Sequence, residues 1–196
     1  MRFLKPMQKC VIKLTNHQLK LASEADYPLT KNQVIQNICL LFDSLAKELQ
    51  STAFSPPFSM LNHADYKITK GENYKGLPYV VLDYPKISGA EFPILFRTLF
   101  WWGNYFSFNV IVQDKKLQHD IRLNEASEVY VLTGSDRWEN DLYSSTYIKV
   151  KGSVTPDMLP QTDFLRIAST LPIDAYETLI EKSQFYLRFI HSYETK

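Results

Sequence analysis

Two runs of large apolar and aromatic residues, joined by a Gly-Asn pair, constrain the fold of this chain more than any other feature. Both runs lie within residues 92–112, and Gly103-Asn104 stands between them. Gly adopts positive φ without a Cβ clash, and Asn tolerates it better than most residues, so the pair predicts a two-residue hairpin turn. We therefore expect two strands paired at the centre of an antiparallel sheet.

A two-residue turn also fixes which strand residues share a face. It pairs Trp102 with Tyr105, and cross-strand partners point to the same side of a sheet. The apolar face of the second strand, which carries Phe108, then joins Leu99 and Arg97. This register predicts that Arg97 lies among apolar neighbours on the closed face, or near its edge, where it needs a partner.

The start of this stretch allows an alternative. Ser88 followed by Glu91 fits a capping box, which would make residues 90–97 a short helix leading into the strand. Phe, Thr and Ile are enriched in strands, so the strand is the preferred interpretation.

The placement of glycine separates the ends of the chain from its middle. All six glycines lie between Gly71 and Gly152. Glycine marks turns and is disfavoured inside helices, so residues 1–52 and 155–193 are predicted to be helical around a strand-rich segment, residues 65–151. Besides the central hairpin, strands are expected at residues 66–70, 78–84, 129–132 and 145–151.

Two helices are predicted to cover one face of the sheet. The first spans residues 31–50, after a break at Asp26-Tyr27-Pro28, and begins with a capping box made by Thr30 and Gln33. The second spans residues 173–193. Shorter helical pieces are expected at Thr155-Pro156-Asp157 and at residues 163–169. Residues 6–23 fit a helical stripe, while residues 10–14 also fit a short strand. The prediction is thus a single α+β domain, residues 1–196, with five or six antiparallel strands.

Composition and charge exclude several functional classes. A formal net charge of +1 gives no general basic surface for nucleic acid. No apolar run reaches the length of a membrane helix. The first ten residues lack the apolar core of a signal peptide, and Cys10 and Cys39 fit reduced thiols. We therefore expect a cytoplasmic protein without nucleic-acid or membrane partners.

Standard catalytic and metal-binding motifs do not occur in the sequence. There is no H-E-x-x-H, no C-x-x-C and no G-x-S-x-G. Gly71 and Gly76 have the spacing of a phosphate-binding loop, but Leu77-Pro78 follows where Lys and Ser or Thr are required. No cofactor and no metal are therefore predicted.

A few titratable residues support an enzymatic alternative. His63 with Asp65 fits a general base or a metal-binding pair, although an exposed pair at a strand entry is the preferred interpretation. His119-Asp120 allows the same two interpretations. Asp83, at the end of an apolar strand, fits a buried acid or the cap of a turn. The alternative function is an enzyme, such as a hydrolase, that uses His63, Asp65 or Asp83 beside an aromatic pocket.

Aromatic residues beside arginine give the leading functional hypothesis, a non-enzymatic binding protein. Trp101 and Trp102 at the hairpin tip fit a stacking platform, with Arg97 supplying charge, although core packing is the preferred interpretation. Arg137-Trp138 follows Gly134 in a loop, and loops carry recognition residues more often than core strands do. The predicted ligand-binding residues are Arg97, Trp101, Arg137 and Trp138. The expected partner is a small molecule or another protein, and the aromatic surplus also suggests a homodimer.

Two segments of the middle third resemble a known group of proteins. The runs KGENYKGLPYVVLDYP, residues 70–85, and FRTLFWWGNYFSF, residues 96–108, are similar to a small family of uncharacterised bacterial proteins of unknown function. The resemblance implies a bacterial origin and an intracellular setting. It implies no catalytic residue, because that family has no assigned activity.

Overall fold

A computed structural model of the protein describes residues 12–89, 92–113, 124–154 and 162–194. A short helix, α1 (Asn16–Ser23), precedes a long one, α2 (Asp26–Ser51), and a 3-10 turn, η1 (Ser59–Leu61). The strands formed by the described residues are β1 (Lys67–Tyr74), β2 (Leu77–Tyr84), β3 (Ile94–Trp101), β4 (Tyr105–Val112), β5 (Asn124–Leu132), β6 (Tyr147–Ser153) and β7 (Leu165–Pro172). The last helical elements are η3 (Ile173–Thr178), α4 (Leu179–Lys182) and α5 (Gln184–Glu194).

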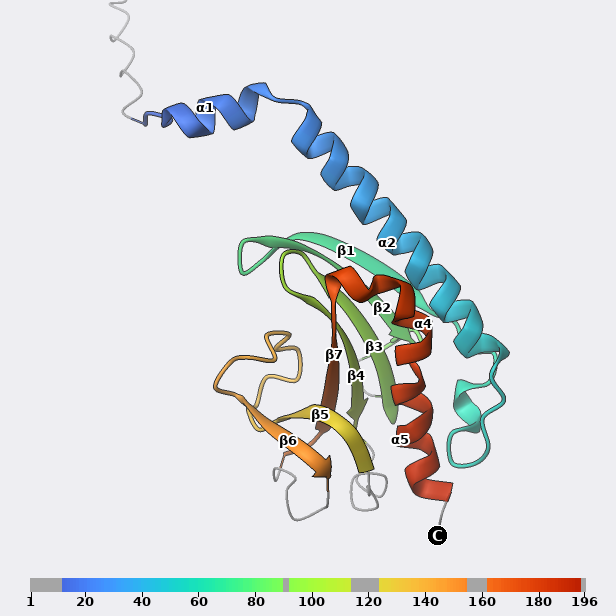
Figure 1. The fold of residues 1–196 in the computed structure, drawn as a ribbon. Helices are drawn as coiled ribbons and strands as arrows, with labels where there is room; N and C mark the ends of the chain where they lie inside the picture. The colour runs from blue at the N-terminus through green and yellow to red at the C-terminus, as the bar shows by residue number, and fades with distance from the viewer. Residues whose placement is uncertain (1–11, 90–91, 114–123, 155–161, 195–196) are drawn as a thin grey trace, which may run out of the picture.

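The strands form one antiparallel sheet in the order β1-β2-β3-β4-β7-β5-β6 (Figure 1). The α+β class with a single antiparallel sheet is confirmed. The described residues contribute seven strands, however, and not the five or six that were predicted.

Strand β7 corrects a prediction, because residues 163–169 were expected to form a short helix. Its side chains alternate between two apolar clusters, with Leu165 and Ile167 in one and Ala168 in the other. An alternation with a period of two is typical of a strand. Because both faces of β7 are buried, apolar residues occur on each face, and the alternation is not visible in the sequence. Part of the segment predicted to be helical from residue 155 to residue 193 is therefore a strand.

The central hairpin forms, but its register differs from the prediction by one residue. Trp101, not Trp102, pairs with Tyr105. The turn therefore has three residues: Asn104 N–H donates to Trp101 O (3.0 Å) and Gly103 has φ 71°. A shift of one residue moves a strand's side chains to the opposite face. Arg97 consequently lies on the face opposite to Phe108, although it still shares a face with Leu99.

Helices α2 and α5 share one apolar core with the sheet. Phe42 of α2 packs edge-on against Phe106 of β4, with ring centroids 6.2 Å apart. Tyr186 of α5 stacks on Phe96 of β3 at 4.6 Å, and its hydroxyl is 2.8 Å from Thr98 Oγ1. All five side chains are buried, and burying an aromatic side chain contributes about 2–3 kcal/mol. This core fixes β3 and β4, which carry the centre of the site described below.

Helix α2 begins earlier than its sequence pattern indicated. It starts at Asp26, after Ala25, which makes no side-chain cap. The break expected at residues 26–28 is instead the first turn of the helix. Backbone N–H groups in the first turn have no partner within the helix, so Pro28 fits there without the loss of a hydrogen bond. The predicted capping box of Thr30 and Gln33 therefore lies inside the helix and does not form the start.

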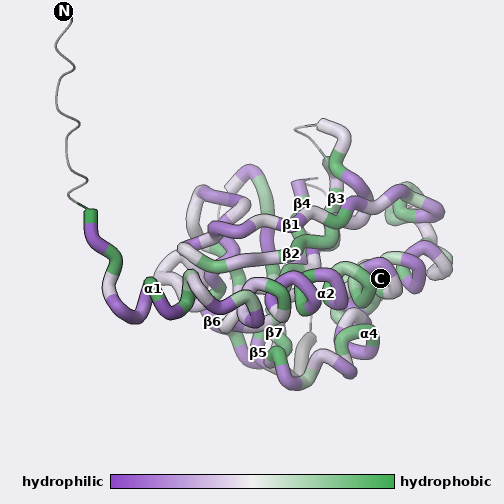
Figure 2. The backbone as a smooth tube through the Cα atoms, turned by 90° about the horizontal axis from the view of Figure 1, so that it is seen from above, coloured by the Kyte–Doolittle hydropathy of each residue, from purple (hydrophilic) through white to green (hydrophobic). Residues whose placement is uncertain are grey.

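The N-terminal helix extends away from the sheet, as Figures 1 and 2 show. Helix α1 starts with a capping box made by Thr15 and Gln18, and none of its residues is buried. Of the segment predicted to be helical from residue 6 to residue 23, residues 16–23 form α1, whereas residues 12–15 form neither helix nor strand. Residues 1–11, the predicted turn at residues 155–157 and residues 90–91 lie outside the described residues. Residues 94–97 belong to β3, which contradicts the alternative helix at residues 90–97.

The connection between β5 and β6, residues 133–146, covers the face of the sheet opposite to the helices (Figure 1). Leu142 of this connection packs in an apolar cluster with Leu99 and Trp101 of β3. Tyr105 of β4 also fixes it, because its hydroxyl donates to Asn140 O (3.1 Å) and accepts from Leu142 N–H (2.8 Å). We call residues 133–146 the covering loop. In the described part of the chain, no helix is long and apolar enough to cross a membrane.

Candidate ligand-binding site

A row of polar side chains crosses the sheet beneath the covering loop. Asp83 of β2 pairs with Arg97 of β3, and Arg97 pairs with Asn109 of β4. Arg166 of β7 pairs with Ile111 of β4, and its side chain donates to the side chain of Asn109, two residues earlier on β4. Cross-strand partners share a face, so strands distant in the sequence bring these four groups together.

Asp83 and Arg97 form a two-pronged ion pair. Arg97 Nε donates to Asp83 Oδ1 (2.7 Å) and Arg97 NH2 donates to Asp83 Oδ2 (2.9 Å). The two side chains are 12% and 11% exposed, and charge-assisted bonds of this geometry are strong when water is largely excluded. Arg97 also lies over the ring of Trp138, 4.3 Å from its centroid. The guanidinium is therefore held at one edge by a carboxylate and on one face by an indole.

Arg166 is fully buried and links β4 to the covering loop. Its Nε and NH2 donate to Asn109 Oδ1 (3.1 and 2.8 Å), NH1 donates to Arg137 O (2.8 Å), and NH2 donates to Asn140 Oδ1 (3.1 Å). Burial lowers the pKa of Arg166 below its usual value. All these acceptors are neutral, and no carboxylate of a described residue forms an ion pair with it.

Tyr74 of β1, at the other end of the polar row from Arg166, also holds the covering loop in place. Its hydroxyl donates to the Glu139 carboxylate and accepts the N–H groups of Asn140 (3.0 Å) and Asp141 (3.1 Å). Burial, and next the hydrogen bond to Glu139, raise the pKa of Tyr74 to about 12. For Glu139 burial acts to raise the pKa, but the bonds from Tyr74 and from Asp141 N–H hold it below its usual value.

A cavity of about 420 Å³ opens beside the ion pair. The Asp83–Arg97 pair, Trp138 and Asn140 line it, together with Tyr74 and Tyr79. Thr69, Val81 and Asp136 complete its walls. We call this space the Arg97 cavity. Its residues come from three strands and the covering loop, so the folded sheet creates a site that no single segment contains.

The four predicted ligand-binding residues have different positions. Arg97 and Trp138 meet at the Arg97 cavity. Trp101 is outside its lining, is 5% exposed and packs in the apolar cluster under the covering loop. Arg137 contributes its carbonyl to Arg166, while its guanidinium lies 5.7 Å from the ring centroid of Phe164.

The residues of the enzymatic alternative are not collected in one cavity. Asp83 lines the Arg97 cavity, but His63 and Asp65 do not, and both are exposed. His63 adopts φ 57°, and the Asp65 carbonyl accepts the N–H of Lys86 (2.5 Å). His119 and Asp120 lie outside the described residues. Within the described ranges, no group of three or more His, Cys, Asp or Glu side chains is placed to hold a metal ion.

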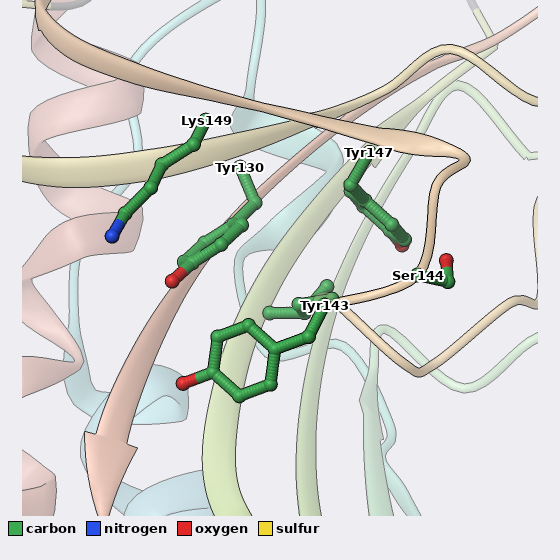
Figure 3. Close-up of a pocket in the computed structure, with 6 residues that line it drawn as sticks. Tyr130, Tyr143, Ser144, Tyr147 and Lys149 are labelled. Carbon is green, nitrogen blue, oxygen red and sulfur yellow. The ribbon is translucent and has the colours of Figure 1, made fainter.

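A second, smaller cavity of about 220 Å³ is lined by other residues of the covering loop and by β5 and β6. Tyr130, Tyr143, Tyr147 and Lys149 surround it (Figure 3). Tyr143 packs edge-on against Tyr130 with ring centroids 5.7 Å apart, and Lys149 lies 5.9 Å from the Tyr130 ring centroid. Lys149 also pairs with Glu128. We call this space the tyrosine cavity, and it provides matched controls for the Arg97 cavity.

Sequence patterns missed several residues that build the Arg97 cavity. Tyr74, Tyr79 and Asn140 were not singled out, and neither were Asn109 and Arg166 behind it. Asn109 and Arg166 did carry a signal, because each is a strongly polar residue inside an apolar strand. Comparison of the chain with protein-family models, with curated proteins and with solved structures found no match.

Proposed function

We propose that this protein is a non-enzymatic binding protein whose ligand site is the Arg97 cavity. One observation carries the proposal: Asp83, Arg97 and Trp138 converge from β2, β3 and the covering loop on a cavity of about 420 Å³. Small-molecule sites are typically concave, roughly 300–1,000 Å³ in volume, and combine aromatic walls with a few convergent polar groups. The Arg97 cavity has each of these properties.

The polar groups of the Arg97 cavity are held in place before any ligand arrives. Asn140 illustrates this, because its N–H donates to Tyr74 and its carbonyl accepts from Tyr105. Its side-chain oxygen accepts from Arg166. Groups that are already ordered lose little conformational entropy on binding, which favours affinity for a small ligand.

The same contacts favour binding over hydrolysis. Among the described residues, the lining of the Arg97 cavity includes no His, Cys, Ser or Lys. Asp83 has both carboxylate oxygens occupied by Arg97, so it is an ion-pair partner and not a free base. The remaining chemistry suits recognition by hydrogen bonds and aromatic contact.

The proposal includes a cytoplasmic setting and a small-molecule ligand, without nucleic acid or membrane as partner. The homodimer expected from the aromatic content stays a prediction. Sedimentation at two protein concentrations tests it, and a monomer at both would contradict it.

A thermal-shift screen against small metabolites tests the binding function. A ligand of the folded state raises the melting temperature, and the rise grows with ligand concentration relative to Kd. We expect at least one metabolite to stabilise the wild type and Tyr143→Ala, which alters the tyrosine cavity, but not Trp138→Ala. A metabolite that stabilises Trp138→Ala as much as the wild type would place its site elsewhere.

A further inference from the structure

Several polar groups of the Arg97 cavity have no hydrogen-bond partner among the residues that the structure describes. The Tyr79 hydroxyl, the Thr69 hydroxyl and Trp138 Nε1 make no hydrogen bond with any other described residue. Asn140 Nδ2 also makes no hydrogen bond with another described residue, because the bonds of Asn140 use its backbone N–H, its backbone carbonyl and its side-chain oxygen. The cavity therefore offers hydroxyl, indole and amide groups whose hydrogen bonds are available to a ligand.

The charges of the Arg97 cavity do not select for a charged ligand. Asp83 and Arg97 neutralise each other, and Asp136 is the other ionised group in the described lining. Arg166, behind Asn140, carries the opposite charge to Asp136. An anion would therefore meet two carboxylates, and a cation would meet Arg97 with Arg166 behind it.

We propose, building on the binding function proposed above, that the ligand of the Arg97 cavity is a neutral sugar in its pyranose form. A pyranose combines patches of C–H groups with a rim of hydroxyls that both donate and accept hydrogen bonds. The rings of Tyr74, Tyr79 and Trp138 provide apolar surface for the C–H groups, and each ring also carries a polar atom at its edge. Each Asp83 carboxylate oxygen accepts one bond from Arg97 and has capacity for one more, so it can accept from a sugar hydroxyl, while Asn140 Nδ2 can donate to a neighbouring hydroxyl.

A flat heteroaromatic ligand fits the Arg97 cavity less well. Such a ring is held mainly by stacking on an aromatic face. One face of Trp138 is already covered by the Arg97 guanidinium at 4.3 Å, and Phe92 packs against the same indole with ring centroids 6.2 Å apart. A sugar needs less of that surface, because its hydroxyls contribute the directional contacts.

Titration calorimetry with two matched Tyr→Phe variants tests the proposal. The probes are the methyl glycosides of glucose, galactose and mannose, together with glucuronate, glucosamine and glucose 6-phosphate as charged counterparts. Tyr79→Phe removes only the unpartnered hydroxyl, and Tyr143→Phe makes the same change at the tyrosine cavity. We expect a neutral glycoside to bind the wild type, about fivefold to tenfold weaker binding to Tyr79→Phe, and unchanged binding to Tyr143→Phe.

The other outcomes separate the ligand class from the binding function. If only charged probes bind, and Trp138→Ala or Tyr79→Phe weakens them, the cavity binds ligands but the neutral-sugar proposal is wrong. If neutral glycosides bind and only Tyr143→Phe weakens them, the sugar site is the tyrosine cavity and the proposal is again wrong. If no glycoside binds the wild type, the sugar proposal falls, and the metabolite screen decides on the binding function. An unchanged unfolding midpoint for Tyr79→Phe shows that the fold is intact.

Discussion

Arg166 and Asn109 are joined by two hydrogen bonds to a single oxygen, from Nε (3.1 Å) and from NH2 (2.8 Å), inside the folded protein. Arg166 is fully buried, and in the described ranges it has no ion-pair partner. A buried cation is costly unless hydrogen bonds satisfy it. The stability of the protein and the position of the covering loop therefore both depend on this guanidinium.

We expect Arg166→Lys to reduce the free energy of unfolding by about 3 kcal/mol, because an ammonium group has no planar fork to reach acceptors on both β4 and the covering loop. Urea denaturation measures the change. Arg137→Lys is the matched control: it keeps the backbone carbonyl that Arg166 uses, and its expected cost is below about 1 kcal/mol. Equal losses in the two variants would show that the fork geometry is unimportant.

The ion pair at the Arg97 cavity should matter far more than a surface pair. Removing Asp83 leaves the nearly buried Arg97 without its carboxylate, so Asp83→Ala should cost about 2–4 kcal/mol. Lys47→Ala breaks the Asp43–Lys47 pair on α2, in which Lys47 is 67% exposed, and leaves the hydrogen bond from the Tyr66 hydroxyl to Asp43 in place, so it should cost much less. Chemical denaturation of both variants compares them. A small loss for Asp83→Ala would contradict the tight pairing described above.

Alkaline titration should reveal Tyr74. Its pKa rises from 10.0 to about 12 in the folded protein, so between these values the unfolded chain releases a proton that the folded chain keeps. The stabilising contribution is complete below pH 10 and is lost as pH rises toward 12. The unfolding free energy should therefore fall more steeply with pH in the wild type than in Tyr74→Phe. Other buried tyrosines are common to both proteins, and parallel curves would refute the shift.

Gly71 should control ligand affinity through Tyr79. A Cβ at Gly71 would lie 2.5 Å from two atoms of the Tyr79 ring, so Gly71→Ala forces that ring to move. The clash is with the end of a flexible side chain, so we expect the unfolding free energy to change by less than about 1 kcal/mol. Binding of the sugar ligand should weaken about tenfold.

Gly89→Ala is the control for this substitution, because a Cβ there meets no atom within 4 Å. Calorimetry on both variants provides the comparison. If Gly71→Ala binds the ligand as well as Gly89→Ala does, Tyr79 is not part of the site.

The hairpin shows how local patterns predict the fold and still misplace the site. Alternating aromatic residues around Gly103 correctly predicted β3 and β4. One additional residue in the turn then reversed the face of Arg97, because strand side chains have a period of two. Turn length depends on backbone hydrogen bonds such as Asn104 N–H to Trp101 O, which the residue types alone do not decide.

The candidate site was predictable where a residue stood out from its neighbours: Arg97 as a charge among the aromatic residues of the hairpin, Trp138 in a loop and Asp83 at a strand end. All three residues line the Arg97 cavity. Asn140 and Tyr79 were not singled out, since Asn140 bonds to Tyr74 and Arg166, and Tyr79 meets the covering loop only in the folded cavity. Arg166 was hidden in a segment interpreted as helical, so its partnership with Asn109 required the strand order of the sheet.

The strand order has a consequence for how this protein is synthesised. Strand β7 lies between β4 and β5, although it follows both of them and β6 in the chain. A nascent polypeptide that has not yet reached residue 165 can pair β1 to β4 and, separately, β5 with β6, but it cannot join the two pieces. Arg166 arrives on the same strand, so translation of one late segment both closes the sheet and delivers the cation that anchors the covering loop.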